Sequence, residues 1–356
     1  SGPLVANPDP MHLDVVPFFG PMYVTGAASG LGLAQTEPVL GLDHRVTMDL
    51  SNAQVALQTT EGLFQFFLEP AAYSLPTLGV PYQFSKVGVA TNLYGGLPVA
   101  WGKLAPSDNF SVQGGKLPTL IGAEYMFTFQ NMNIERGLLW NQEPVVSRGV
   151  QGNLTTGPVA WSLSLNDGYY SGKYNWLSGA ATWTIDPANS LTVTAGGALS
   201  RNAVAGPATP LAQNNSTIVE AAYTYNNAPW TITPYVQYTH VGADAVLGFG
   251  QDAATIGGAV LASYKFNNYF SLAGRWEYIA SNGSAAAGAP DLLGFGPGSA
   301  AMSLTLTPTF QNGIFFLRGE ASLTQAYSVT AGSALLFGNG SGRTQARFLV
   351  ETGVVF

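Results

Sequence analysis

The sequence RTQARFLVETGVVF (residues 343–356) changes character at every second position. Arg343, Arg347 and Glu351 fall on one side of the alternation, and apolar residues such as Phe348 fall on the other. Successive side chains of a strand leave the backbone on opposite faces, so this period predicts a β-strand with one polar and one apolar face. In a soluble sandwich the apolar face packs on a second sheet. In a membrane-spanning barrel it contacts lipid, and the rest of the chain must decide between these folds.

The composition favours the membrane-spanning alternative. Charged residues make up 9% of the 356 residues, although hydrophobic residues reach 46%, whereas soluble domains carry about 25% charged residues. Aromatic residues reach 12%, as expected if rings form belts at two membrane interfaces. The sequence has no continuous apolar run of the length that a transmembrane helix needs. We therefore expect strands rather than helices in the membrane.

Several classes of function are disfavoured by what the chain contains. It has no cysteine, which excludes disulfides and thiolate-bound metals. His12, His44 and His240 are far apart, and no nucleophile–base spacing is recognisable. We predict no catalytic, cofactor or metal site, and the formal net charge of −7 argues against nucleic acid. The N-terminal residues 1–10 are neither basic nor strongly apolar, so we expect that a targeting segment has already been removed.

Segments with a period of two recur along nearly the whole chain. One of them, 45–58, changes phase near Ser51 and Asn52, which indicates a β-bulge. FTFQNMNIERGLL (127–139) could add a further pair, which would make eighteen strands. We predict sixteen strands, at residues 12–25, 45–58, 62–72, 97–105, 109–116, 146–156, 158–166, 174–185, 189–200, 216–225, 229–239, 255–266, 268–279, 299–310, 313–326 and 343–356.

The connections between these strands alternate strictly between short and long. Short ones such as DPAN (186–189) and NNAP (226–229) carry the residues that tight turns need. Transmembrane barrels have short periplasmic turns and longer external loops, whereas a soluble sandwich has no reason for such a rule. The sequence therefore predicts an all-β, up-and-down antiparallel transmembrane barrel, formed by one domain that spans residues 1–356.

Charged residues of the last strands lie on the face that we assign to the barrel lumen, because charges facing lipid are very unfavourable. These residues are Arg275, Glu277, Arg318, Glu320, Arg343, Arg347 and Glu351. Counted from the turns, Arg275, Arg318 and Arg347 come at the same depth. One interpretation is a basic wall that sets a transverse field in a pore, and the other is a set of ion pairs that brace the wall.

The longest connection, 117–145, is unusually apolar for an exposed loop, since it contains YMFTF and GLLW. It also carries Glu124, Glu135, Arg136 and Glu143. We predict a constriction loop that folds into the lumen and faces the arginines. The alternative is an external loop packed on its neighbours or on another subunit.

The central sequence SVQGGKLPTLIGAEYMFTFQNMNIERGLLWNQEPVVSRGVQGNLTTGPVAWSLSLNDGYY (111–170) has a GKLP strand end, a long segment, a Gly-Val strand and a hairpin with NDG at its tip. In these features it resembles the OmpL-like β-barrel porin family. The last strand, which ends in Phe356, is similar to the assembly signal that the barrel insertion machinery of bacteria reads. These resemblances imply a diffusion pore in the bacterial outer membrane.

A passive porin for small hydrophilic solutes is thus the leading hypothesis, surrounded by outer-membrane lipid. Mild selectivity is expected because inward acidic and basic residues nearly balance. A structural sheath or anchor filled by a partner protein, and a surface adhesin or receptor, are the alternatives. Residues 1–100 contain the least regular strands, as a subunit contact could, so we also expect a homotrimer.

Overall fold

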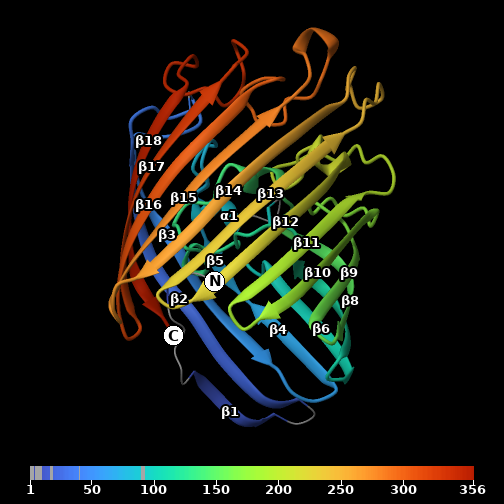
Figure 1. The fold of residues 1–356 in the computed structure, drawn as a ribbon, viewed down its shortest axis with the longest axis vertical. Helices are drawn as coiled ribbons and strands as arrows, with labels where there is room; N and C mark the ends of the chain where they lie inside the picture. Colours follow the sequence, from blue (N-terminus) through green and yellow to red (C-terminus); the bar gives the residue numbers. More distant parts are fainter. Residues whose placement is uncertain (1–3, 5–9, 17–18, 40, 90–92) are drawn as a thin grey trace.

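The computed structural model describes all residues except 1–3, 5–9, 17–18, 40 and 90–92. The strands of the described residues form one antiparallel sheet that closes into a barrel (Figure 1). They are β1 (Met11–Val16), β2 (Gly20–Gln35), β3 (Val46–Thr59), β4 (Phe64–Glu69), β5 (Ala71–Tyr73), β6 (Val99–Ser107), β7 (Phe110–Pro118), β8 (Val146–Thr156), β9 (Val159–Asn166), β10 (Trp176–Asp186), β11 (Asn189–Ala198), β12 (Ser216–Asn227), β13 (Trp230–Val241), β14 (Ala253–Lys265), β15 (Phe270–Ser281), β16 (Ala300–Asn312), β17 (Phe315–Tyr327) and β18 (Thr344–Val355).

Sixteen strand positions make up the closed wall. The last strand, β18, pairs with β2 and closes the barrel, so the wall has no open edge, which lipid would not tolerate. The short strands β4 and β5 follow one another along β3 and together fill a single position, with Pro70 between them. The other extra strand, β1, pairs with the first residues of β2. The predicted sixteen-stranded, all-β barrel is confirmed.

The first predicted strand is wrong in its boundaries. Residues 12–25 span β1, a turn and the start of β2, and residues 17–18 lie outside the described part. The predicted loop 26–44 is strand as far as Gln35. Outward positions of β2 from Ala28 to Ala34 hold only alanine and glycine, so hydropathy shows little contrast between its two faces. The loop that follows is therefore shorter than predicted.

The bulge in β3 is confirmed. Ser29 of β2 pairs with Asn52 and Gly30 pairs with Leu50, which leaves Ser51 as the extra residue. Both Ser51 and Asn52 are completely buried, because a bulge lets two successive side chains point to the same side. The bulge thus directs two polar groups into the lumen.

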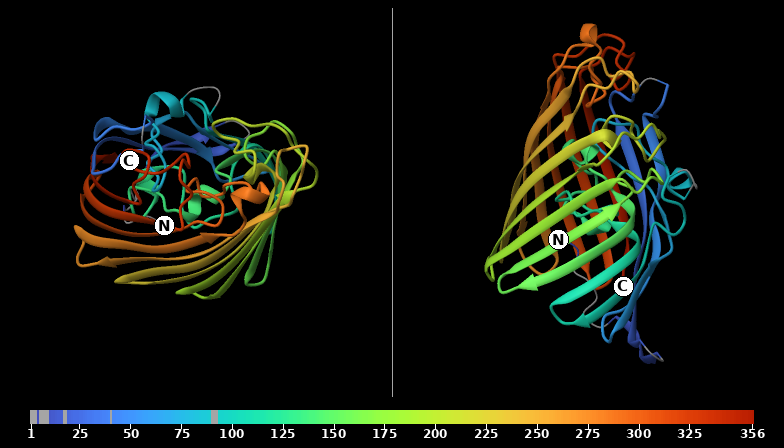
Figure 2. Two further views of the ribbon diagram at one scale, coloured as in Figure 1. Left: turned by 90° about the horizontal axis from the view of Figure 1, so that it is seen from above. Right: turned by 90° about the vertical axis from the view of Figure 1, so that its right-hand side faces the viewer.

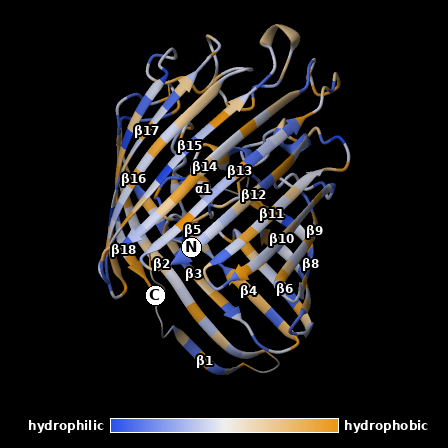
Figure 3. Ribbon diagram, in the orientation of Figure 1, coloured by the Kyte–Doolittle hydropathy of each residue, from blue (hydrophilic) through white to orange (hydrophobic). Residues whose placement is uncertain are grey.

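Strands elsewhere alternate between a lumen face and a lipid face, as the hydropathy colours in Figure 3 show. On β18, Gln345, Arg347 and Glu351 are buried, whereas Phe348 and Val350 are more than half exposed. The structure also has the short connections that the sequence predicts. Only residues 108–109 separate β6 from β7, and only 187–188 separate β10 from β11.

The three arginines, which were expected at one depth, do not share one row of paired residues. Arg275 pairs with Thr305, Thr305 with Ser322, and Ser322 with Arg347, which places Arg275 and Arg347 in one row across the wall. Arg318 instead pairs with Glu351, four residues along β18 from Arg347. Strands of a barrel are staggered, so counting residues from the turns does not give depth.

The lumen contains chain segments rather than open space alone, as the view from above in Figure 2 shows. The connection 119–145 folds inside the ring of strands. The stretch 127–139 forms no strand pair there. It contains the 3₁₀ turn η1 (Thr128–Gln130), and η2 (Leu139–Gln142) follows. The described residues do form eighteen strands, but this stretch contributes none of them. The two strands beyond the sixteen positions are β1 and the second of the pair β4 and β5.

Candidate functional site

Segment 119–145 is held against the inner wall by side chains of β14–β18, β2 and β3. Its residues Ile134, Glu135, Arg136 and Leu139 are completely buried. The apolar ones pack into clusters, the largest of which joins Leu138 and Leu139 to wall residues and to external loops. An apolar loop is buried here because the lumen, unlike bulk solvent, offers it a surface to pack on.

The first polar anchor is Arg275 on β15. Its Nη1 lies 2.5 Å from Glu124 Oε1, its Nε lies 3.3 Å from Glu277 Oε2, and Nη1 also donates to the carbonyl of Glu135 at 2.6 Å. Glu277 in turn accepts the backbone N–H of Leu138 at 3.0 Å. A Cβ on Gly137 would overlap the Glu277 carboxylate, so glycine allows this close approach.

The second anchor is Arg318 on β17. It donates to the backbone carbonyls of Thr128, Asn131 and Met132, each at 3.0 Å, and lies 3.4 Å from Glu351 Oε2. The same glutamate accepts the Thr128 hydroxyl at 2.5 Å. Asn52, which the β3 bulge directs inward, also donates to Glu351 at 3.2 Å.

The third anchor combines Arg347 on β18 with Glu320 on β17. Arg347 lies 2.9 Å from Glu135 Oε1 and 3.4 Å from Asp43 Oδ2. Glu320 accepts the backbone N–H groups of Ile134 and Glu135, at 2.5 and 2.9 Å. Each charge of these three anchors is thus matched by a charge or a backbone dipole of an inner segment.

A second inner segment, residues 74–84, is not anticipated by the sequence analysis. The backbone N–H of Arg136 donates to the Pro76 carbonyl at 3.1 Å, and the Arg136 carbonyl accepts the N–H of Leu78 at 3.0 Å. The Nη1 of Arg136 also donates to the Pro76 carbonyl, at 3.0 Å. Arg347 donates to the carbonyls of Thr77 and Val80, both at 2.7 Å. The apolar, proline-containing sequence SLPTLGVPYQF (74–84) in a long connection is the signal that could have indicated this segment.

Arg136 differs from the wall arginines because no ion pair to it is found in the described part of the chain. Its guanidinium donates to the carbonyls of Tyr125 and Met126 as well as Pro76, and lies over the Trp140 ring at 5.6 Å. Burial lowers the pKa of Arg136 to about 10, although the charge of Glu124 opposes this effect. Arg136 therefore joins the two inner segments to each other.

Three candidate residues lie apart from these anchors. Arg343 is exposed just before β18. Glu143 is buried beside β12 rather than beside the arginines, and burial together with repulsion from Glu220 raises its pKa well above the ordinary value. Phe356 pairs through its backbone with Gly26 of β2, where its ring covers the outer face.

The half of the lumen nearest the turns is more open. Most inner side chains there are uncharged, polar and half-buried: Gln113, Asn153, Ser162, Thr182, Thr192 and Thr224. Two lysines share this face, since Lys103 pairs with Gln113 and Lys265 pairs with Ser271. Under the inner segments, by contrast, Ser303, Thr305 and Thr307 are completely buried. A cavity of about 370 Å³ lies between β4, β6 and the segment 118–146, and its lining includes Glu69 and Trp101. We call the more open half the vestibule.

A closed barrel with an apolar outer face and chain segments bound inside its lumen defines an outer-membrane channel protein of the porin type. No helix among the described residues is long and apolar enough to cross a membrane. Comparison of the sequence with curated proteins gives no match.

The sequence of residues 24–356 matches the family model described as "Putative beta-barrel porin-2, OmpL-like". The chain belongs to this OmpL-like family of outer-membrane β-barrel porins, as its central sequence suggested. Porins are channels rather than enzymes, which confirms the prediction of a non-enzymatic protein of the outer membrane.

Solved porin structures share the fold at low sequence identity. The anion-selective porin from Comamonas acidovorans is 12% identical with a TM-score of 0.65, and the match covers 94% of this chain and 99% of that one. For the outer membrane channel DcaP of Acinetobacter baumannii the values are 12%, 0.61, 94% and 97%. For OmpT of Vibrio cholerae in its trimer form they are 10%, 0.58, 94% and 99%.

Proposed function

We propose that this porin admits small hydrophilic solutes through the vestibule and that segments 74–84 and 119–145 form its constriction. The asymmetry of the lumen carries the proposal. Inner residues near the turns are mostly polar and uncharged, with Lys103 and Lys265 as the charged exceptions, whereas the charged residues under the segments are buried in ion pairs. A polar wall with so few charges offers hydrogen bonds and attracts one sign of charge only weakly, so selectivity in the vestibule is mild.

The three wall arginines then act mainly as anchors. Arg275, Arg318 and Arg347 are at most 1% exposed, and each is within 3.4 Å of a carboxylate oxygen. Charges compensated at such short range contribute little field to a solution beyond them. This favours the bracing interpretation over an exposed basic wall. The sheath hypothesis is disfavoured, because the chain's own segments take the space that a partner protein would need.

Cysteine labelling tests the route, since the natural chain has no cysteine. Thr182 faces the vestibule on β10, and the next residue, Trp183, faces outward with 47% exposure. In planar bilayers, a charged thiosulfonate reagent should lower the conductance of Thr182→Cys and leave Trp183→Cys unchanged. An equal response of both variants, or none at Thr182→Cys, would show that solutes do not pass along this wall.

A homotrimer is the proposed assembly, with the outer faces of β2 and β3 as the contact. The support is the flat row of alanine and glycine on β2 and the neighbouring Met48, which is 86% exposed. The similar fold of OmpT from Vibrio cholerae, whose structure is described as a trimer form, agrees with this assembly. The proposed contact thus lies within the first hundred residues.

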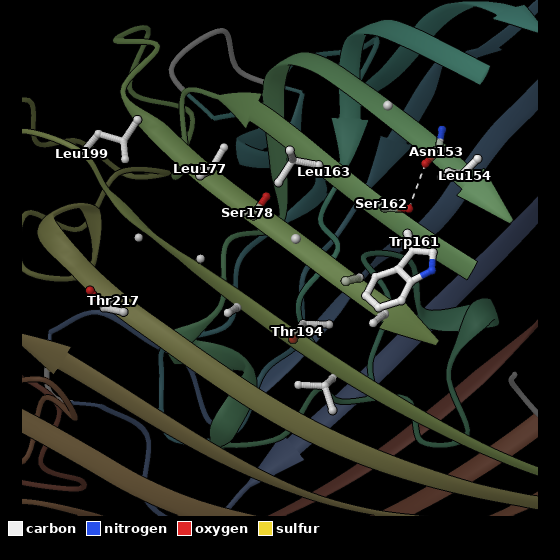
Figure 4. Close-up of a pocket in the computed structure, with 18 of the residues that line it drawn as sticks. Asn153, Leu154, Trp161, Ser162, Leu163, Leu177, Ser178, Thr194, Leu199 and Thr217 are labelled. Carbon is white, nitrogen blue, oxygen red and sulfur yellow. Dashed lines mark hydrogen bonds between the residues drawn. The ribbon is translucent and has the colours of Figure 1, made fainter. Parts of the chain in front are cut away.

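A competing surface lies on the opposite side of the barrel. Trp161, Leu163 and Leu177 border a depression of about 920 Å³ over β8–β11 (Figure 4). A bifunctional thiol cross-linker should join subunits of Met48→Cys and not those of Leu163→Cys. Cross-linking only at Leu163→Cys would move the interface to the depression, and a monomeric mass in mild detergent would remove the trimer.

A further inference from the structure

Two buried carboxylates approach each other on the side of the lumen away from the arginine anchors. Glu143 directly follows η2 and is 4% exposed, and Glu220 on β12 is 3% exposed. Both border Gly122. A Cβ on Gly122 would overlap the Glu143 carboxylate, while the backbone N–H of Gly122 donates to Glu220. Glycine at this position thus lets the inner segment pass between the two acids.

Neither acid has the compensation that the other inner glutamates have. No lysine, arginine or histidine forms an ion pair with Glu143 or Glu220 in the described ranges. Both oxygens of Glu143 and one oxygen of Glu220 lack any hydrogen-bond donor among the described residues. Two buried negative charges without partners are strongly unfavourable. Something that this chain does not supply must neutralise them.

The surroundings are rich in oxygen and equally short of partners. On the inner face, Glu220 pairs across the sheet with Thr194 on one side and Gln237 on the other. Both amide atoms of Gln237, the hydroxyl of Thr194 and the hydroxyl of nearby Tyr235 have no partner in the described chain, and all three residues are at most 3% exposed. Such unpaired groups around two acids indicate an enclosed site for a ligand.

We infer that this site binds a divalent cation, with the carboxylates of Glu143 and Glu220 and the amide oxygen of Gln237 as ligands. Calcium and magnesium prefer oxygen ligands of this kind, whereas zinc and copper prefer the nitrogen and sulfur that are missing here. A charge of +2 balances the two carboxylates. Because only two of the ligands are acidic, hydroxyl or backbone oxygens complete the coordination. The ion joins the end of segment 119–145 to β12.

Calcium titration of the purified protein in detergent, after removal of divalent ions with a chelator, tests this inference. We expect about one bound calcium per chain by elemental analysis, and an unfolding midpoint that rises when calcium is restored. Glu143→Gln and Glu220→Gln should weaken calcium binding at least tenfold. Glu69→Gln is the matched control, because Glu69 is also a buried inner-wall carboxylate and is bonded to the amide of Gln54. It should bind calcium like the wild type.

The opposing explanation is that the two acids share a proton instead of binding a cation. It predicts the opposite effect of the glutamine substitutions on stability. Glutamine imitates a protonated acid, so Glu143→Gln would then be as stable as the wild type or more stable, with or without calcium. That result, or the absence of stoichiometric calcium and magnesium in the wild type, overturns the cation site. If the variants do not fold, the metal content of the wild type and the effect of the chelator on its stability distinguish the cation site from the shared proton. The proposed function is tested by channel conductance, which is measured separately. A negative result on the cation site would therefore not contradict the proposed function.

Discussion

Replacement of Arg318 by methionine tests whether the wall arginines anchor the constriction. The guanidinium bonds three backbone carbonyls of segment 119–145 and pairs with Glu351. Methionine keeps much of the side-chain volume but leaves the carbonyls without these donors and the carboxylate without its cation. Breaking a buried pair from one side costs about 3–5 kcal/mol.

This loss changes the docking equilibrium of the segment by roughly 10²- to 10⁴-fold, since 1.36 kcal/mol corresponds to a factor of ten. Arg275 and Arg347 still hold the segment, so complete release is not expected. Single-channel recordings should instead show more frequent openings of larger conductance. The control is Arg201→Met, which removes a surface pair with Asp244 whose arginine is about half exposed. Exposed pairs contribute at most about 1 kcal/mol, so this variant should behave like the wild type.

Arg318 does not anchor the constriction if Arg318→Met and Arg201→Met give the same openings as the wild type. A changed ion preference at unchanged conductance would support the alternative, in which the arginines set a field across the pore. Recordings at low salt separate the two, because field effects of exposed charges are screened as ionic strength rises.

Three further variants extend these tests. The double variant Arg318→Met/Glu351→Leu should be more stable to urea than Arg318→Met alone, because it leaves no unpaired buried charge. Equal stability would mean that the unpaired carboxylate of Glu351 is not what destabilises Arg318→Met. Gly26→Ala should lower the folded fraction in a heat-modifiability assay by straining β2 against both β3 and the end of β18. An added Cβ would overlap the Gln54 carbonyl oxygen and lie 2.7 Å from Phe356 Cζ; an unchanged fraction would contradict this. Arg343→Gln should leave conductance and ion preference at wild-type values, because Arg343 is exposed just before β18 and forms none of the three anchors; a clear change would show that Arg343 acts on passing ions.

The wall could be predicted from the sequence wherever its two faces differ in chemistry. The last strand alternates between arginine or glutamate and apolar side chains, so its inner face was readable directly. On β2 the outward positions hold alanine and glycine, whose small side chains give little hydropathy contrast between a lipid face and a solvent face. The strand was therefore misplaced, although its pairing with β18 closes the barrel.

The candidate site was predictable in its residues but not in its contacts. The charges of β15, β17 and β18 were identified by their period of two, which is a local property. Besides carboxylates, their partners include backbone carbonyls and N–H groups of the inner segments, and every residue carries a carbonyl. No sequence pattern marks which carbonyl an arginine will reach. For the same reason, the contribution of residues 74–84 could not be seen.

This use of the backbone has an evolutionary consequence. The wall arginines hold the carbonyls of Thr128, Asn131, Met132, Thr77 and Val80 rather than their side chains. A substitution at these five positions keeps the carbonyl, provided that the backbone conformation is retained. The inner segments can therefore accumulate mutations, and with them new solute preferences, while their attachment to the barrel persists. Variation among related porins should accordingly be tolerated more readily in the side chains of these segments than in the arginines that hold them.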